Sequence, residues 1–481
     1  MPHCQLRITN YELRIEKLLT THYPLLTTHY SLPTTHYSLL TTHYPLTMIF
    51  YSTNKKAPSA SLEDVVIKSL ASDKGLYMPE QIPVLDKRLI SSMKSMSFIE
   101  MSDIIAQAFF GEDMDTEALS AIVHETLSFE TPVVHIHDNI YTLELFHGPT
   151  LAFKDVGARF MARMLSYFIL HKGMDREVNV LVATSGDTGG AVANGFFDVP
   201  GIHVYVLYPK GKVSPIQECQ FTTLGKNITA LEIDGTFDDC QALVKAAFID
   251  DELNRHLQLT SANSINVARF LPQSFYYFNA YAQLDRLGKA DELIVCVPSG
   301  NFGNLTAGLF AYKMGLPIKH FIAANNRNDV FLEYLKTGIY TPRPAVETYA
   351  NAMDVGAPSN FARILDLFDN NHKQISALIS GFRYTNEQIT STIRTTHTNS
   401  NYILDPHGAC AYQALADYGL KPNETGLFLE TAHPAKFKET VDHILHSNIE
   451  IPSPLQSFMQ GQKQSTPLPK AFKAFKDFLL Q

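Results

Sequence analysis

Lys154 is the residue in this sequence best placed for covalent chemistry. It lies in LAFKDVGARFMARML (residues 151–165), where an apolar stretch gives way to a strongly helical pattern, and Ala152 and Phe153 precede it. Partial removal from water lowers the pKa of a lysine amine and makes it a better nucleophile. The alternative is a lysine that reaches solvent along its apolar stem, and the residue alone does not separate the two.

Two short loops could bind a ligand, because each follows an apolar run and precedes a helical stretch. Residues 299–304, SGNFGN, carry two glycines that let the backbone approach an anion at a helix N-terminus. This loop is neither a P-loop nor a GxGxxG fingerprint. Residues 184–190, TSGDTGG, place Ser185, Asp187 and Thr188 at the expected carboxyl edge of a sheet. Taken alone, each loop could also be a tight turn with an N-cap and close packing.

The elements that would position these residues alternate between buried strands and helices. Four continuous apolar runs are separated by helical stretches: VNVLVA (178–183), IHVYVLY (202–208), ITALEI (228–233) and LIVCVP (293–298). Such runs are typical of parallel strands that helices cover on both faces. The sequence therefore predicts an α/β fold. A Schiff-base lysine together with a phosphate loop of non-Walker type in such a fold indicates pyridoxal 5′-phosphate (PLP).

The composition excludes several other classes of protein. Hydrophobic residues make up 45% of the 481 residues and charged residues 18%, so the chain can bury a large core in two to four domains. A formal net charge of −9 argues against a nucleic-acid partner. No apolar run reaches the roughly 18 residues that a membrane span needs, so we expect no membrane partner.

The five cysteines are widely spaced and odd in number, without a CxxC pair. We therefore expect neither a disulfide framework nor a metal site. The N-terminus shows no pattern of a secretory signal, and the expected compartment is the cytoplasm.

A tetrapeptide repeat sets the first 47 residues apart. TTHY recurs four times with a period of seven between Thr20 and Tyr44, and prolines interrupt any helix there. The period is too short for a solenoid repeat. Ordinary globular composition begins abruptly at Met48. Our hypothesis is that residues 1–47 derive from a short DNA repeat upstream of the true start, and that they are disordered or absent from the native protein.

From Met48 almost to the C-terminus, the sequence resembles the threonine synthase family, in the longer form found in many bacteria and fungi. Eight blocks in family order carry the resemblance, and together they exclude chance. They are GLYMPEQIP (75–83), HGPTLAFKD (147–155), ATSGDTGGA (183–191), KVSPIQECQFTTLG (212–225), SANSIN (261–266), VPSGNFGNLTAG (297–308), MDVGAPSN (353–360) and TAHPAKF (431–437). One departure is Ala357, where relatives often have a bulkier residue.

The resemblance implies a role for several residues at the cofactor. Lys154 matches the lysine that forms the Schiff base with PLP, and Phe153 would pack beside the ring. Asp187 would lie near the cofactor's 3′-oxygen, and Thr431 would face the pyridine nitrogen. A neutral hydroxyl there moderates the electron sink, because it cannot stabilise a pyridinium as a carboxylate would. The phosphate cradle is formed by Gly300, Asn301, Phe302, Gly303 and Asn304.

The implied reaction converts O-phospho-L-homoserine and water into L-threonine and phosphate, the last step of threonine biosynthesis. Lys154 would remove the Cα proton, phosphate would leave from Cγ, and water would add at Cβ. The candidates for binding the substrate are Ser185, Thr188, Asn263, Arg269 and Lys212, of which the two basic residues could instead be surface ion-pair partners. His407 and Arg363 lie in family-like segments without an assigned chemistry.

The resemblance also implies a tryptophan-synthase-β-like architecture of two α/β domains plus an N-terminal module. We expect that module at 48–135 and a large PLP-binding domain from 136–169 and 268–481. A small mobile domain (170–267) would close over the cofactor when substrate binds. The protein would act as a monomer or homo-oligomer.

Three alternatives share parts of this pattern. A PLP-dependent phospho-lyase acting on phosphothreonine or phosphoserine would use the same lysine and phosphate loop. A dehydratase would have S-x-K-x-R-G around its lysine, where this chain has AFKDVG. A non-catalytic PLP-binding regulatory protein would be expected to lose Lys154 or a loop glycine, and all of these are present.

Overall fold

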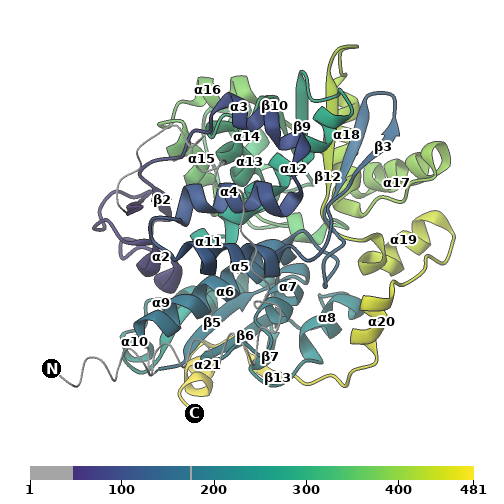
Figure 1. Ribbon diagram of the computed structural model, residues 1–481. Helices are drawn as coiled ribbons and strands as arrows, with labels where there is room; N and C mark the ends of the chain where they lie inside the picture. The colour runs from purple at the N-terminus through teal and green to yellow at the C-terminus, as the bar shows by residue number, and fades with distance from the viewer. Residues whose placement is uncertain (1–46, 174–175) are drawn as a thin grey trace.

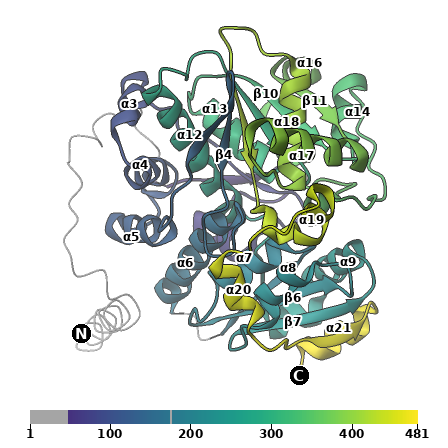
Figure 2. The ribbon, with the colours of Figure 1, turned by 90° about the vertical axis from the view of Figure 1, so that its right-hand side faces the viewer.

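Two α/β bodies, each built on a largely parallel sheet, make up most of the structure (Figures 1 and 2). The computed structural model describes residues 47–173 and 176–481. The TTHY repeats lie outside the described residues, and the hypothesis about residues 1–47 stays a prediction. The α/β class expected from the apolar runs is confirmed, because each of the four runs forms a parallel strand.

The six-stranded sheet has the strand order β11-β10-β9-β12-β4-β3, and only the β3–β4 pair is antiparallel. Its central strands are fully buried, as continuous apolar runs require. The strands are β3 (Val133–His137), β4 (Ile140–Glu144), β9 (Leu293–Pro298), β10 (Ile318–Asn325), β11 (Ile379–Arg383) and β12 (Thr425–Glu430). The helices of this body are α12 (Ser274–Arg286), α13 (Gly303–Lys313), α14 (Val330–Thr337), α15 (Phe361–Leu367), α16 (His372–Leu378), α17 (Asn386–Ser400) and α18 (Pro406–Tyr418).

The five-stranded sheet is parallel throughout, in the order β13-β7-β6-β5-β8. Its strands are β5 (Val178–Ala183), β6 (Ile202–Pro209), β7 (Ile228–Asp234), β8 (Gln258–Ser261) and β13 (Thr466–Pro469). The helices packed around it are α7 (Asp187–Gly195), α8 (Pro215–Thr222), α9 (Phe237–Phe248), α10 (Asp251–His256) and α21 (Phe472–Leu479). Between the two bodies run α6 (Lys154–Lys172) and α11 (Val267–Phe270).

The C-terminal segment returns to the five-stranded sheet, which differs from the boundary expected for the large domain at residue 481. After β12 the chain passes through α19 (Lys438–Leu445) and α20 (Ser453–Met459), and α20 packs on α8. Strand β13 then pairs with β7, and α21 packs on α9 (Figure 2). The amphipathic α21 buries Phe475 and Leu479 there. The rest of the division into domains stays a prediction.

The N-terminal segment forms a helical layer against α6 and α12 (Figure 1). Its elements are β1 (Phe50–Ser52), α2 (Leu62–Lys68), β2 (Tyr77–Pro79), α3 (Lys87–Ser92), α4 (Phe98–Phe110) and α5 (Thr116–Thr126). Aromatic contacts join this layer to the main bodies. The ring centroids of Phe110 and Phe160 on α6 are 5.7 Å apart, and those of Phe109 and Phe310 on α13 are 6.2 Å apart. In the described part of the chain, no helix is long and apolar enough to cross a membrane.

Arg363 on α15 links the N-terminal layer to the loop that follows β8. Its side chain is fully buried and donates hydrogen bonds to the carbonyl oxygens of Tyr77, Ser264 and Ile265, at 2.6–3.2 Å. Its guanidinium also lies 4.0 Å from the centroid of the Phe270 ring. Arg363 therefore has a structural role that its sequence context did not reveal.

We predict that Arg363→Lys destabilises the protein by about 2–3 kcal/mol, because a single ammonium cannot reproduce this fork of hydrogen bonds in a buried site. The measurement is urea denaturation followed by circular dichroism. Arg88→Lys is the control, since the Arg88 side chain is 79% exposed. Equal stability of the two variants would contradict the structural role.

Candidate active site

The carboxyl ends of the two sheets face one cavity. Strand β5 delivers the loop TSGDTGG to it, and β9 delivers SGNFGN. The predicted site residues that line the cavity are Phe153, Lys154, Ser185, Thr188, Asn263, Arg269, Gly300, Asn301, Phe302, Gly303, Asn304 and Thr431. Residues separated by as many as 278 positions in sequence are thus brought into one site by the fold. No group of three or more His, Cys, Asp or Glu side chains within residues 47–173 and 176–481 could hold a metal ion.

Lys154 is the first residue of α6, and its side chain is 14% exposed. Burial lowers the pKa of its amine to about 8, although the carboxylate of Asp187, 3.7 Å away, opposes this shift. An amine with this pKa is about one-quarter unprotonated at pH 7.5, against about one in a thousand for a lysine in water. Lys154 is therefore available as a nucleophile and a base near neutral pH.

Hydrogen bonds from distant elements hold the backbone around Lys154. The Phe153 amide donates to the carbonyl oxygen of Thr431 (2.9 Å), and the Tyr276 hydroxyl donates to the carbonyl oxygen of Phe153 (2.6 Å). The Asp155 carboxylate, next to Lys154 in the chain, accepts from the amide and hydroxyl of Thr150. The block HGPTLAFKD thus forms a fixed loop that aims the amine into the cavity.

The loop SGNFGN has the features of an anion cradle. Phe302 adopts a left-handed conformation (φ 61°) that turns the chain into the 11-residue α13, so the free amides of the first helical turn face the cavity. A Cβ atom at Gly300 would lie 2.7 Å from the carbonyl oxygen of Ala352, and one at Gly303 would lie 2.9 Å from Ser264. Glycine is required at both positions because neighbouring loops press against the cradle.

Asn304 adds a side-chain donor to this cradle. The Tyr277 hydroxyl donates to the Asn304 side-chain oxygen at 2.8 Å and so fixes the orientation of the amide. The Asn304 Nδ2 is buried and has no hydrogen-bond partner among the described residues. An unpartnered donor beside a helix N-terminus fits the phosphate group of PLP.

Arg269 forms a second cationic centre in the cavity. It is 2% exposed, and its Nε and Nη1 have no hydrogen-bond partner in the described part of the chain. Burial lowers the pKa of its guanidinium to about 10, so Arg269 stays charged at neutral pH. A buried, unpaired cation is costly unless an anion joins it. Ser185, Thr188 and Asn263 line the same cavity and supply neutral polar groups.

Lys212 does not join this group, contrary to the expectation from the sequence. It is exposed in the turn after β6 and does not line the cavity. Two other residues of its block face inward: Ser214 caps α8, and the Gln217 Nε2 donates to Asp187 at 2.9 Å. The motif KVSPIQ thus marked a segment near the site, but the turn at Gly211 (φ 67°) leaves the lysine in solvent.

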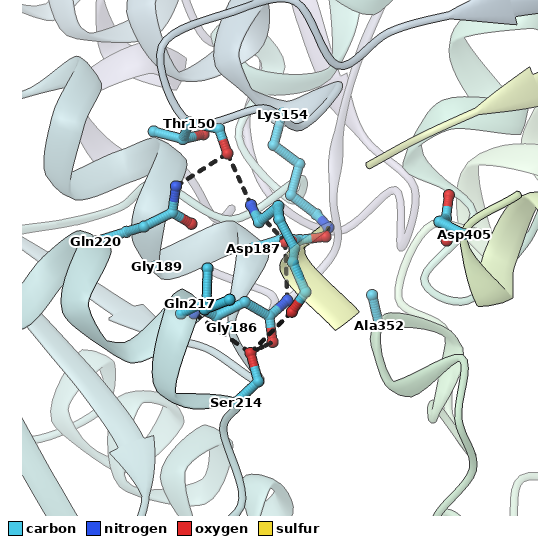
Figure 3. Close-up of polar contacts among 12 residues, drawn as sticks. Thr150, Lys154, Gly186, Asp187, Gly189, Ser214, Gln217, Gln220, Ala352 and Asp405 are labelled. Carbon is cyan, nitrogen blue, oxygen red and sulfur yellow. Dashed lines mark hydrogen bonds and ion pairs between the residues drawn. The ribbon is translucent and has the colours of Figure 1, made fainter. Parts of the chain in front are cut away.

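Asp187 lies behind the cavity wall, within a network of buried polar contacts (Figure 3). Its Oδ1 accepts from Gln217 and forms an ion pair of 2.7 Å with Lys436, and its Oδ2 faces Lys154. Burial alone would raise the pKa of this carboxyl, but the ammonium groups of Lys436 and Lys154 hold it well below the usual range. Lys436 was missed in the sequence, although its position between Ala435 and Phe437 in TAHPAKF is a signal of burial.

His407 orients another cavity loop. Its Nδ1 lies 2.5 Å from Asp405, and its Nε2 accepts a hydrogen bond from the Ala352 amide (3.2 Å). This pair of contacts places the ring proton on Nδ1. Beside them, burial and the Asp405 carboxylate raise the pKa of Glu430 well above its usual range, so Glu430 is a neutral carboxylic acid. His407 therefore fixes the loop that presses against Gly300.

Comparisons with known proteins cover almost the whole chain after residue 48. Residues 126–429 match the family model described as pyridoxal-phosphate dependent enzyme, residues 49–127 match threonine synthase N terminus, and residues 408–479 match threonine synthase, C-terminal. Threonine synthase from Haemophilus influenzae is 44% identical over 434 residues, which cover 90% of this chain and 100% of the relative. The enzyme from Saccharomyces cerevisiae is 35% identical over 459 residues, covering 83% of this chain and 89% of the relative.

Solved structures show the same likeness. The crystal structure of threonine synthase from Escherichia coli superposes with a TM-score of 0.85 at 43% identity, covering 90% of this chain and 99% of that chain. A PLP-bound threonine synthase from Brucella melitensis gives a TM-score of 0.83 at 34% identity, with 90% and 98% covered.

We predict that Gly300→Ala weakens PLP binding by about tenfold or more, because the added methyl group meets backbone atoms of Ala352 and Met353 and displaces the cradle. The measurement is titration of the apoprotein with PLP, followed by visible absorbance. Lys212→Ala is the control, since Lys212 is exposed and does not line the cavity. Unchanged affinity in Gly300→Ala would show that this loop does not hold the cofactor.

Proposed function

The chain belongs to the threonine synthase family of PLP-dependent enzymes, and on this premise we propose which of its residues hold the cofactor, bind the substrate and move protons. The protein is a PLP-dependent lyase of amino-acid biosynthesis that acts on a small molecule. The observation that carries the residue assignment is a buried amine of lowered pKa that shares one cavity with two separate anion-binding centres.

Lys154 is the residue that holds PLP covalently in this proposal. The amides of 300–304 and the Asn304 side chain bind the cofactor's phosphate, Thr431 faces the pyridine nitrogen, and Asp187 lies near the 3′-oxygen. Support comes from the cavity itself, which has Lys154, Thr431 and the cradle in its lining. When bound, PLP supplies an electron sink for negative charge that develops at the carbon atoms of the substrate.

The substrate is O-phospho-L-homoserine, and Arg269 binds its phosphate group. A buried guanidinium whose Nε and Nη1 have no hydrogen-bond partner among the described residues suits an anion such as a phosphate. Ser185, Thr188 and Asn263 complete the phosphate site. The two anion centres of the cavity thus match the two phosphates that the reaction brings together, one on the cofactor and one on the substrate.

Lys154 also carries the protons of the reaction. With PLP and substrate bound, the Lys154 Nζ would take the proton from the substrate Cα and would return protons at later steps. A pKa of about 8 lets the same group act as base and acid near neutral pH. The buried cavity limits access of water until water is needed as the second substrate.

We infer the cytoplasm as the compartment. The described cysteines, Cys219, Cys240, Cys296 and Cys410, form no disulfide with one another. Burial raises the pKa of each of these thiols, which keeps them unreactive. Such cysteines suit a reducing compartment.

We predict that the protein releases phosphate from O-phosphohomoserine and forms one threonine for each phosphate. Lys154→Ala is expected to lower the rate of phosphate release by at least about a thousandfold, since it removes both the covalent attachment of PLP and the base. The measurement couples phosphate release to amino-acid analysis of the product. Lys212→Ala is the matched control and keeps full activity. Phosphate with 2-oxobutyrate, or turnover of phosphothreonine only, would favour the phospho-lyase alternative instead.

We predict that Arg269→Lys raises KM for O-phosphohomoserine by about tenfold or more, because lysine lacks the paired donors that bind a phosphate. The visible absorbance of bound PLP is expected to stay unchanged. Steady-state kinetics and an absorbance spectrum measure the two effects separately. An unchanged KM would remove Arg269 from the substrate site, and a loss of absorbance would place it at the cofactor instead.

A further inference from the structure

Lys436 is a fully buried lysine for which neither the fold nor the proposed reaction accounts. It lies in a short 3₁₀ turn (Pro434–Phe437) that follows β12, and its side chain is 0% exposed. Its Nζ lies 2.7 Å from Asp187 Oδ1 and donates to the carbonyl oxygen of Thr150 at 2.9 Å. Removing an ammonium group from water costs several kcal/mol unless a partner compensates. The burial of the Lys436 ammonium group therefore needs a functional explanation.

The two oxygens of Asp187 face different partners. Oδ1 is bound by Lys436 and by the amide of Gln217, at 2.7 and 2.9 Å. Oδ2 is 3.7 Å from the Lys154 amine, which is outside hydrogen-bond distance. In Figure 3, the Lys154 side chain is directed toward Asp187. Gln217 lies on the other side of the Asp187 carboxylate. The shorter contacts of Asp187, with Lys436 and Gln217, are thus made by Oδ1, whereas the ion pair of Oδ2 with Lys154 is about 1 Å longer.

In this arrangement, Lys154 and Lys436 compete for the carboxylate of Asp187. A Lys154 ammonium in a tight ion pair with Asp187 would hold its proton and could act neither as nucleophile nor as base. The Lys436 charge lowers the pKa of Lys154, whereas Asp187 raises it. The titratable groups that face either member of the Lys154–Asp187 pair are Lys436, Arg269, Asp405 and His407.

We propose that Lys436 is a positioning residue that binds Asp187 from the side away from Lys154, keeps the ion pair between this carboxylate and Lys154 long (3.7 Å), and so leaves the Lys154 amine able to react. The inference rests on Lys154 as the reactive amine of the proposed function. It does not depend on which phosphorylated amino acid is the substrate.

The surrounding contacts hold Lys436 in this place. The Ser214 hydroxyl donates to the carbonyl oxygen of Lys436 (3.1 Å), and the same hydroxyl lies 3.1 Å from the Gln217 side-chain oxygen. The His433 ring caps the 3₁₀ turn by accepting from the Ala435 amide (3.1 Å). Lys436 follows a strand of the six-stranded sheet, while Asp187 opens a helix of the five-stranded body, so their ion pair also connects the two bodies.

The test measures the protonation of Lys154 directly, in the absence of substrate. The apoprotein is labelled at a series of pH values with a small amine-reactive acetylating reagent, and the modification of Lys154 is quantified by peptide mass spectrometry. We expect a midpoint near pH 8 for the natural protein. In Lys436→Met and Lys436→Gln, the midpoint is expected to move upward by about one pH unit or more, so labelling at pH 7.5 falls about tenfold. In the holoenzyme, kcat at pH 7.5 falls and recovers as the pH is raised.

A double variant and a neighbouring lysine serve as controls. In Lys436→Met with Asp187→Asn, the competing carboxylate is gone, and the midpoint is expected to return to the natural value or below it. Lys438→Met removes a nearby lysine that pairs with Asp442 instead, and it is expected to leave the midpoint unchanged. Lys436→Gln, which can still donate to Thr150, decides the matter if Lys436→Met does not fold.

Two results would overturn the proposal. An unchanged Lys154 midpoint in the Lys436 variants would leave Lys436 with a structural role only, whatever the loss of stability. An upward shift that persists in the double variant would show that Asp187 does not mediate the effect. Failure of the proposed function would give a different result. A protein that does not act on O-phosphohomoserine would still show the shift in the pH midpoint of Lys154 labelling.

Discussion

The structure depends on removing the Lys154 amine from water without a close ion pair to the Asp187 carboxylate. Burial lowers the pKa of Lys154, and the Asp187 carboxylate, in a long ion pair of 3.7 Å with the amine, opposes that shift without cancelling it. The ion pair between Asp187 and Lys436 satisfies the carboxylate from the other side. The Phe153 amide donates to the carbonyl oxygen of Thr431 and the Tyr276 hydroxyl donates to that of Phe153, and these two hydrogen bonds fix the amine at the start of α6. These contacts come from segments that lie far apart in sequence, so the site exists only in the complete fold.

The same fold concentrates positive charge in a protein with a net charge of −9. The N-terminus of α13 and the buried Arg269 form two separate anion centres, and each has donors without a partner among the described residues. Free donors in a buried cavity are costly in the ligand-free protein and favourable once phosphates occupy them. This arrangement supports our proposal that the cavity binds two phosphate groups.

Much of the fold and the centre of the site followed from the sequence. Continuous apolar runs identified the parallel strands, and the residue types of the two loops predicted an anion cradle and a polar wall, both of which line the cavity. What escaped prediction depends on contacts across the fold: Lys436 reaches Thr150 over 286 positions, and Arg363 reaches Tyr77 over the same separation. Lys212 shows the converse limit, because a motif places a segment near a site but does not decide which of its side chains turn inward. The return of β13 to the five-stranded sheet likewise rests on a pairing that no local pattern encodes.

The central claim is that Lys154 is the lysine to which PLP is attached, and the most direct measurement is borohydride reduction of the PLP-loaded protein followed by peptide mapping. Reduction makes the link permanent, so the modified lysine can be identified by mass. The account predicts a pyridoxyl group on Lys154 and on no other lysine. Modification of Lys436, the other lysine in contact with Asp187, would contradict it, and so would a cofactor that washes away after reduction.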